Sequence, residues 1–255
     1  MRNQQPFKSG KYPGGSDPPI DKVCDGRRSS PWYYMPPFGS QVLDQWETYS
    51  SVSGVGVMSA TDSGATSQPT DWYVTITNSG TITRLAGGVN LLTGGTSGNN
   101  TTMQSTRAIT VAANKIQVAV WRATMDVVAT GKYQMGFHLT GQDPIGTQVV
   151  SGAYWGKLTA GTGAMTACTA AASTVTSNTG FTAVLATAYD FGIVINGTTN
   201  VQHWAKPITT PNWTLYATST TNLPAGSMRW TVNATDTSSA AHNLLIGYWN
   251  VAQER

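Results

Sequence analysis

Side chains suited to acid–base chemistry are scarce and scattered in this sequence. Glutamate occurs only at Glu47 and Glu254. Glycosidases generally need two carboxyl groups about 5 to 9.5 Å apart across the scissile bond, and no expected strand carries acidic residues at i, i+2 spacing. Most aspartates stand singly beside turns, where the side chain caps the backbone. We therefore expect turn-capping and no catalytic carboxylate pair at Asp126, Asp143, Asp190 and Asp236.

The histidines form no local motif either. His138, His203 and His242 are the only ones, and none lies within a few residues of another or of a cysteine. Zinc-ligand spacing is therefore absent. His138 and His203 fall in expected strands, where the fold could bring them together, although a hydrogen-bonded strand histidine is the commoner case. No nucleophile-elbow sequence accompanies them, and no glycine loop is followed by Lys and a helix. The sequence predicts no enzyme, no metal site and no cofactor.

Tryptophan is the remaining residue type with a recognisable chemistry, and the chain has nine. An exposed indole ring can stack on the apolar face of a sugar, so tryptophans on one rim would make a carbohydrate-binding surface. The alternative is core packing, because a tryptophan contributes a large buried area, and we expect it for most of them. Those in or beside expected strands are Trp72, Trp121, Trp155, Trp204, Trp213, Trp230 and Trp249.

The two cysteines and the first residues of the chain bear on where the protein is made. Cys24 and Cys168 are too few and too far apart for a disulfide scaffold, so we expect unpaired thiols in a reducing compartment. The first fifteen residues contain no apolar stretch of the signal-peptide kind, and no apolar run approaches the roughly 20 residues of a membrane-spanning helix. We expect synthesis in a cytoplasm and no membrane partner.

The first 40 residues differ from the rest and predict an extended arm. They are rich in Pro and Gly, which exclude a helix or a central strand. Residues 1–28 hold six basic and three acidic residues, which is the whole formal net charge of +3. The neutral remainder carries no basic stripe of the nucleic-acid-binding kind. We expect the arm to bind a partner surface, although it could also wrap over its own domain; the expected contact residues are Arg27, Arg28, Trp32, Tyr33, Tyr34, Met35 and Phe38.

Residues 41–255 predict a single all-β domain, with strands mainly from about residue 70. Only 11% of the chain is charged, against about 25% in an average soluble domain. Abundant Thr favours strands and abundant Gly and Asn favour turns. Nine or ten strands are expected, enough for a two-sheet antiparallel sandwich. Three segments are less regular: residues 41–50 could be a short helix or a strand, residues 87–102 a polar loop, and residues 159–188 edge strands or an oligomer contact. The strands expected with most support are 72–77, 81–85, 115–128, 132–140, 189–195, 201–205, 213–217, 227–234 and 244–252.

The body from about residue 70 resembles the lectin-like (concanavalin-like or jelly-roll) sandwich modules of tailed-bacteriophage structural proteins. The resemblance lies in KIQVAVWRATMDV followed by GKYQMGFHLT, in YDFGIVINGTTNVQHWAK, in the turn LPAGSMRWTVNA and in the ending LLIGYWNVAQER. It implies a virion protein, most simply a capsid decoration (cement) or head-fibre protein that docks on the major capsid protein or another virion protein as a homo-oligomer. The chain lacks the clustered Asp/Asn metal loop of legume lectins, which puts calcium-dependent sugar binding in doubt. The alternative is a tail-associated adhesin that binds a carbohydrate or receptor, such as a host-surface glycan.

Overall fold

A computed structural model describes most of the expected sandwich. The arm and the seven residues expected to contact a partner lie outside the described residues, as do Cys24 and Asp143. The described residues are 43–48, 58–59, 65–67, 72–77, 79–85, 88–126, 130–139, 151–159, 162–210 and 212–254.

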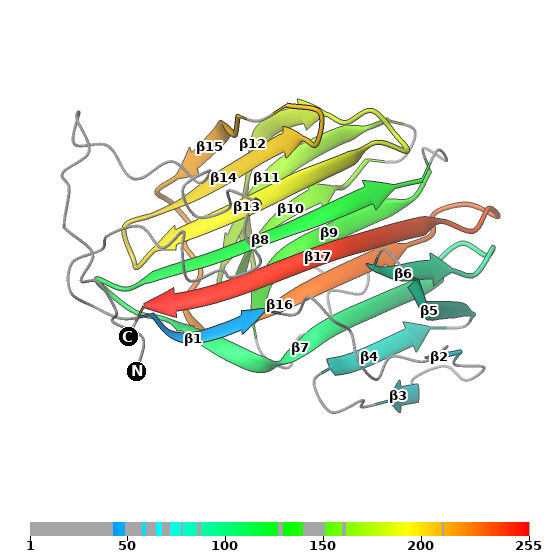
Figure 1. Cartoon of the computed structure of the whole chain (residues 1–255), viewed down its shortest axis with the longest axis horizontal. Helices are drawn as coiled ribbons and strands as arrows, with labels where there is room; N and C mark the ends of the chain where they lie inside the picture. Colours follow the sequence, from blue (N-terminus) through cyan, green and yellow to red (C-terminus); the bar gives the residue numbers. More distant parts are fainter. Residues whose placement is uncertain are drawn as a thin grey trace, which may run out of the picture.

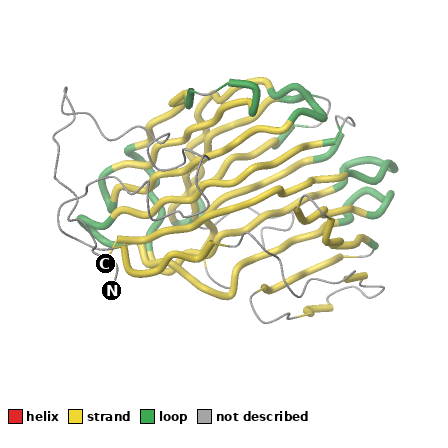
Figure 2. Tube along the Cα trace, viewed as in Figure 1, coloured by secondary structure: helices red, strands yellow, loops and turns green. Residues whose placement is uncertain are grey.

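Two antiparallel sheets lie face to face, and the described residues contain no helix (Figures 1 and 2). Sheet A has nine strands in the order β15-β14-β13-β8-β17-β6-β5-β2, with β1 also paired to β17. Sheet B has eight strands in the order β12-β11-β10-β9-β16-β7-β4-β3. Because no helix is present, none of the described segments could cross a membrane as an apolar helix.

The strands of sheet A are β1 (Leu43–Thr48), β2 (Met58–Ser59), β5 (Gly80–Leu85), β6 (Gly88–Thr93), β8 (Ile116–Met125), β13 (Ala188–Asn196), β14 (Asn200–Pro207), β15 (Thr214–Ser219) and β17 (Asn243–Glu254). Those of sheet B are β3 (Ala65–Ser67), β4 (Trp72–Thr77), β7 (Asn100–Val111), β9 (Lys132–Leu139), β10 (Gly152–Lys157), β11 (Ala164–Ala171), β12 (Thr174–Thr182) and β16 (Gly226–Thr235).

Side-chain alternation fixes which residues of each strand enter the space between the sheets. In β8, Ala119, Trp121, Ala123 and Met125 belong to the main core, whereas the intervening residues face outward. Trp121 stacks on Phe191 of the neighbouring strand, with ring centroids 5.8 Å apart. The two-sheet antiparallel sandwich predicted from the sequence is therefore confirmed.

Tryptophans join the two layers in the centre of the core. Trp121 of sheet A contacts Trp230 of sheet B edge-on at 6.1 Å, and Trp230 stacks on Trp249 at 5.2 Å. Trp155 contacts Phe191 at 5.9 Å. All four tryptophans are at most 1% exposed, so the expectation of core packing holds for them.

Several expected elements are confirmed and others are corrected. Residues 72–77 and 132–139 form strands where expected, residues 41–50 contain strand β1, and residues 159–188 contain β11 and the edge strand β12. The expectation of a polar loop over 87–102 is wrong, because β6 occupies Gly88–Thr93 and β7 begins at Asn100. Strands β13 and β14 form a hairpin in which Asn196 pairs with Asn200, and Thr199 N donates to Asn196 O (2.9 Å) in the turn.

Candidate functional site

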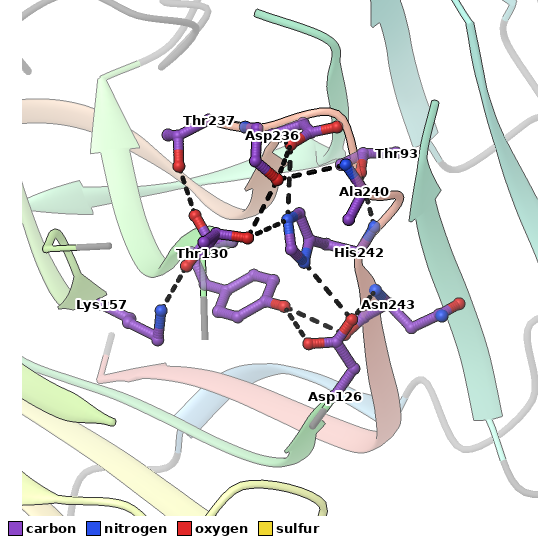
Figure 3. A network of polar contacts seen from close by, with 12 residues as sticks. Thr93, Asp126, Thr130, Lys157, Asp236, Thr237, Ala240, His242 and Asn243 are labelled. Atoms are coloured by element: carbon purple, nitrogen blue, oxygen red, sulfur yellow. Dashed lines mark hydrogen bonds and ion pairs between the residues drawn. The ribbon is translucent and has the colours of Figure 1, made fainter. Parts of the chain in front are cut away.

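Three titratable side chains that are far apart in the sequence meet at one end of the sandwich (Figure 3). Asp126 directly follows β8, Asp236 directly follows β16, and His242 directly precedes β17. Strands β8 and β17 are neighbours in sheet A, whereas β16 belongs to sheet B. The loop from β16 to β17 therefore crosses between the layers and brings Asp236 to the same histidine as Asp126.

The ring of His242 lies between the two carboxylates. Its Nδ1 is 3.5 Å from Oδ2 of Asp126, and its Nε2 is 3.4 Å from Oδ1 of Asp236. Thr130 Oγ1 lies 3.0 Å from His242 Nε2 and 3.0 Å from Ser238 Oγ. The hydrogen-bond contact of Nε2 with Thr130 thus orients the imidazole, while Nδ1 faces the Asp126 carboxylate without a hydrogen bond.

Asp126 is held by donors from both sheets. Its Oδ2 accepts a hydrogen bond from the backbone N–H of Asn243 (2.9 Å), and its Oδ1 accepts one from the hydroxyl of Tyr133 (3.1 Å). Beneath that phenol, Lys157 donates from Nζ to the carbonyl of Gly131 (2.5 Å), and its Nζ lies 5.7 Å from the centroid of the Tyr133 ring. The polar network therefore continues from the loops into sheet B.

Backbone hydrogen bonds tie the surrounding loops to this network. The backbone N–H of Thr93 donates to the carbonyl of His242 (2.9 Å). The hydroxyl of Thr93 accepts a hydrogen bond from the backbone N–H of His242 (2.9 Å). Gly98 N donates to Asp236 O (2.9 Å), and Asp236 N donates to Asn99 O (2.8 Å). The loop between β6 and β7 is thereby fastened to the loop between β16 and β17.

Most of the cluster is buried, which limits its chemistry, and only the Asp126 side chain keeps some exposure, 11%. His242 and Lys157 are 0% exposed and Asp236 is 1% exposed. Burial, reinforced by the charge of Asp126, raises the pKa of Tyr133 far above its usual range, and burial lowers the pKa of Lys157. A dissolved substrate does not reach His242, Asp236 or Lys157, so we assign the cluster a positioning role. It holds three loops together at the end of the sandwich.

Single aspartates turn out to have two different roles. Asp236 caps a turn as expected, because its Oδ1 accepts the backbone N–H of Ser238 (2.8 Å). The same expectation is wrong for Asp190, which lies within β13 and pairs with Arg122 (Nε to Oδ1, 2.7 Å) and Lys206 (Nζ to Oδ2, 3.8 Å). A buried carboxylate within a strand needs such cations, and the linear sequence shows no pairing between strands.

His138 and His203 do lie in strands, but the fold does not bring them together. His138 stacks on Tyr154 (5.1 Å between ring centroids), whereas His203 contacts Trp155 edge-on (5.5 Å). Tyr154 and Trp155 are successive residues of β10 and so point to opposite faces of sheet B. Within the described part of the chain, no group of three or more His, Cys, Asp or Glu side chains could hold a metal ion.

The buried cluster underlies a surface that we call the loop rim, residues 94–99 and 236–243. Residues 95–98 and 239–241 are exposed, and all of them are Gly, Ala, Ser or Thr. A Cβ added to Gly95 would lie 3.0 Å from Ser239 O, so the two loops are in close contact. Asn90 Nδ2 also donates to Asn243 Oδ1 (2.9 Å) beside the rim. The exposed part of the rim thus offers hydroxyl, amide and backbone groups and no charge.

The sequence singles out Asp126, Asp236 and His242 as individual residues, but it does not predict that they lie close together in the fold. The available signal was positional: Asp126 lies near the end of the expected strand 115–128, and Asp236 and His242 lie two residues from the expected strands 227–234 and 244–252. Only the strand order, with β8 beside β17 and β16 in the opposite layer, shows that these strand ends converge.

Known structures define the class of this fold. Peanut lectin with a nine-residue peptide gives a TM-score of 0.50 at 11% identity, covering 78% of this chain and 98% of the lectin. Lectin UEA-II complexed with galactose gives 0.50 at 6% identity, covering 84% of this chain and all of that one. A protein of unknown function from Shewanella oneidensis MR-1 gives 0.56 at 11% identity, covering 96% and 97%. The fold is therefore a lectin-like β-sandwich.

The similarity is confined to the fold. No protein-family profile matches the chain, and no curated protein matches it by sequence. The lectin-like part of the resemblance inferred from the sequence is confirmed, and the virion part stays a prediction.

Proposed function

We propose that this protein is a non-enzymatic binding module that recognises a neutral, hydroxyl-rich ligand, in the first instance a carbohydrate, at its loop rim. The observation that supports this best is the largely buried Asp126–His242–Asp236 cluster beneath an uncharged exposed surface. Burying charged groups costs free energy unless they are paired and hydrogen-bonded, and such departures from ordinary core chemistry concentrate at functional sites. A rigid base preorganises loops for binding because less conformational entropy is lost with the ligand.

The composition of the rim indicates the ligand class. Serine and threonine hydroxyls and amides both donate and accept hydrogen bonds, as sugar hydroxyls do. The exposed described residues of the rim carry no charge that would select a charged ligand. Galactose is a suitable first probe because one of the similar lectins was solved in complex with it.

The test compares substitutions at the rim with one at the opposite end. We expect binding of galactose or another neutral saccharide on a glycan array, and a loss of more than tenfold in affinity for Ser97→Lys and for Ser239→Lys. Ala113→Lys, in the exposed turn between β7 and β8, is the matched control and should bind normally. If Ser97→Lys and Ala113→Lys bound a saccharide equally well, the rim would not be the site; if no neutral saccharide bound the full chain, the proposal would fail.

A second candidate function is attachment to a virion, as a capsid decoration or head-fibre protein or as a tail-associated adhesin. It is supported by the arm, whose first 28 residues carry the entire net charge of the chain and whose aromatic residues suit anchoring. An extended segment needs a partner surface to repay its ordering entropy. The partner would be the major capsid protein or another virion protein.

Deletion of residues 1–40 tests this second function. We expect the shortened protein to keep a cooperative thermal transition and β-type circular dichroism but to lose sedimentation with purified empty capsids. Normal attachment without the arm would exclude this role for it. The saccharide assay on the same shortened protein shows separately whether the loop rim acts alone.

A further inference from the structure

Sheet A carries an apolar cluster on the face that points away from the core. Val118 and Val120 alternate along β8 with core residues, yet they are only 6% and 1% exposed. They form a cluster of their own, separate from the main core. We call it the outer strip: Ile116, Val118, Val120, Val194, Trp204 and Trp213.

The register explains how this cluster is built. Val120 lies opposite Gly192, and Gly192 lies opposite Trp204 on the next strand. Because glycine has no side chain, the indole can extend over the middle strand towards the valine. Val118 pairs directly with Val194. The strip therefore crosses β8, β13 and β14.

One border of the strip is charged and another stays apolar. Arg122, Asp190 and Lys206 lie opposite one another on β8, β13 and β14. Each is two residues from the member of the row formed by Val120, Gly192 and Trp204. Lys206 Nζ is 5.3 Å from the centroid of the Trp213 ring. Leu215, which pairs with Trp204 across β14 and β15, is 42% exposed. The apolar surface thus continues past the tryptophan to the edge of the sheet.

Such a surface suits a protein segment better than a sugar. The outer face of an antiparallel sheet is ordinarily polar, and a contiguous apolar patch marks a contact surface. The accessible apolar side chains here are the partly exposed Val194 and Trp204 with the exposed Leu215 beside them, and aliphatic side chains offer no hydrogen bonds to hydroxyl groups. Large aromatic side chains would fit it, because they contribute much apolar area for few rotatable bonds.

The chain itself supplies an aromatic segment close to this surface. Leu43 at the start of β1 pairs with Glu254 of β17, and on the other side of β17 Ala252 pairs with Val118. The arm therefore joins the body two strand positions from β8, at the end of the sheet where Ile116 and Val118 lie. Strands are about 4.8 Å apart, so β8 is about 10 Å and β14 about 19 Å from β1.

Reach does not limit the contact. Phe38 is five residues before Leu43 and Trp32 is eleven. At about 3.3 Å per extended residue, they can lie up to about 17 Å and about 36 Å from Leu43. Residues 32–38 therefore span the distance from Val118 to Trp204 with length to spare for a turn back onto the sheet.

We propose that the aromatic segment of the arm, residues 32–38, packs on the outer strip of its own chain. Residues 32–38 hold the end of the arm that adjoins the body against sheet A, and the basic segment 2–28 extends beyond it towards any partner. This inference is independent of saccharide binding at the loop rim. It divides the arm into an anchoring part and a reaching part.

Hydroxyl-radical footprinting read by mass spectrometry tests the contact in the full-length protein. We expect Trp204, Trp213 and Leu215 to be weakly labelled in the wild type and labelled several-fold more in the triple variant Trp32→Ala, Tyr33→Ala, Tyr34→Ala. Val184, exposed in the loop before β13, is the control and should not change. Core residue Trp121 should stay unlabelled, which shows that the variant is folded. If it is not, the single variant Phe38→Ala replaces it.

Two outcomes would overturn the proposal. Equal labelling of the strip in wild type and in a folded arm variant would show that the arm does not cover it. Protection that disappears on dilution, with a matching change from dimer to monomer in light scattering, would show that a second copy covers it instead.

Discussion

Acid should destabilise this protein through two histidines buried in the neutral state. His138 and His203 are both 0% exposed, and burial lowers the pKa of each from 6.5 to about 4. In the unfolded chain both rings bind a proton below about pH 6.5. Between pH 6.5 and 4 the unfolded state therefore binds more protons than the folded state, and the free energy of unfolding falls as the pH falls.

The size of the effect follows from the pKa shift. At 1.36 kcal/mol per pKa unit, each histidine costs roughly 3 kcal/mol of stability between pH 7.5 and pH 4. A typical domain has only about 5–15 kcal/mol in total, so the pair would remove a large part of it. The two sites contact different aromatic neighbours, and their effects should be nearly additive.

Phenylalanine substitutions isolate this contribution. His138→Phe keeps a ring against Tyr154, and His203→Phe keeps one against Trp155. We expect each variant to gain roughly 3 kcal/mol relative to wild type on going from pH 7.5 to pH 4, and the double variant to gain about twice that. Urea titrations followed by tryptophan fluorescence at pH 4, 5, 6 and 7.5 measure the difference. A difference between variant and wild type that stayed constant across this range would refute the assignment of buried neutral histidines.

Three further predictions concern other buried groups. Cys168 is buried and its pKa is raised to about 11, so in a Cys24→Ser background it should react with a disulfide reagent at pH 8 only after unfolding; rapid labelling of the native protein would contradict this. Gly131→Ala places a Cβ 2.8 Å from His242 Cγ and should cost about 1–3 kcal/mol in urea unfolding, whereas an unchanged midpoint would show that the loop yields. Lys157→Ala removes a buried, hydrogen-bonded side chain and should lower the free energy of unfolding by about 3 kcal/mol. Lys157→Met, which refills the volume, should recover at least half of that loss. An equal loss in both variants would show that the charge, and not the packing of the side chain, stabilises the protein.

Local sequence patterns predict most of this fold because strand alternation is a local property. Residues 72–77 and 132–139 alternate strongly and lie in strands. Strand β6 could not be predicted in the same way, because Gly88–Thr93 is short and has glycine pairs at both ends, Gly87-Gly88 and Gly94-Gly95. Strand β10 was also missed, since Gly152 and Gly156 interrupt its composition and every one of its residues is buried, which leaves no polar alternation.

The candidate site was harder to predict than the strands because it depends on strand order. Asp126 and His242 are joined by the adjacency of β8 and β17, which no local feature encodes. Asp236 comes from the opposite sheet, so its contact also requires the packing of the two layers. A single sequence specifies turn residues and strand faces, but pairing between distant strands is a property of the whole sandwich.

The position of β17 has a consequence for how the chain folds. This strand is the last in the sequence, yet it lies inside sheet A between β8 and both β6 and β1. Until it has left the ribosome, β8 lacks a partner along one side and β6 has only β5. Sheet A therefore cannot close before β17 is available, and the contacts that complete it are distant in sequence, which predicts slow folding. The unpaired edges exposed in the meantime are the surfaces at which nascent chains would associate.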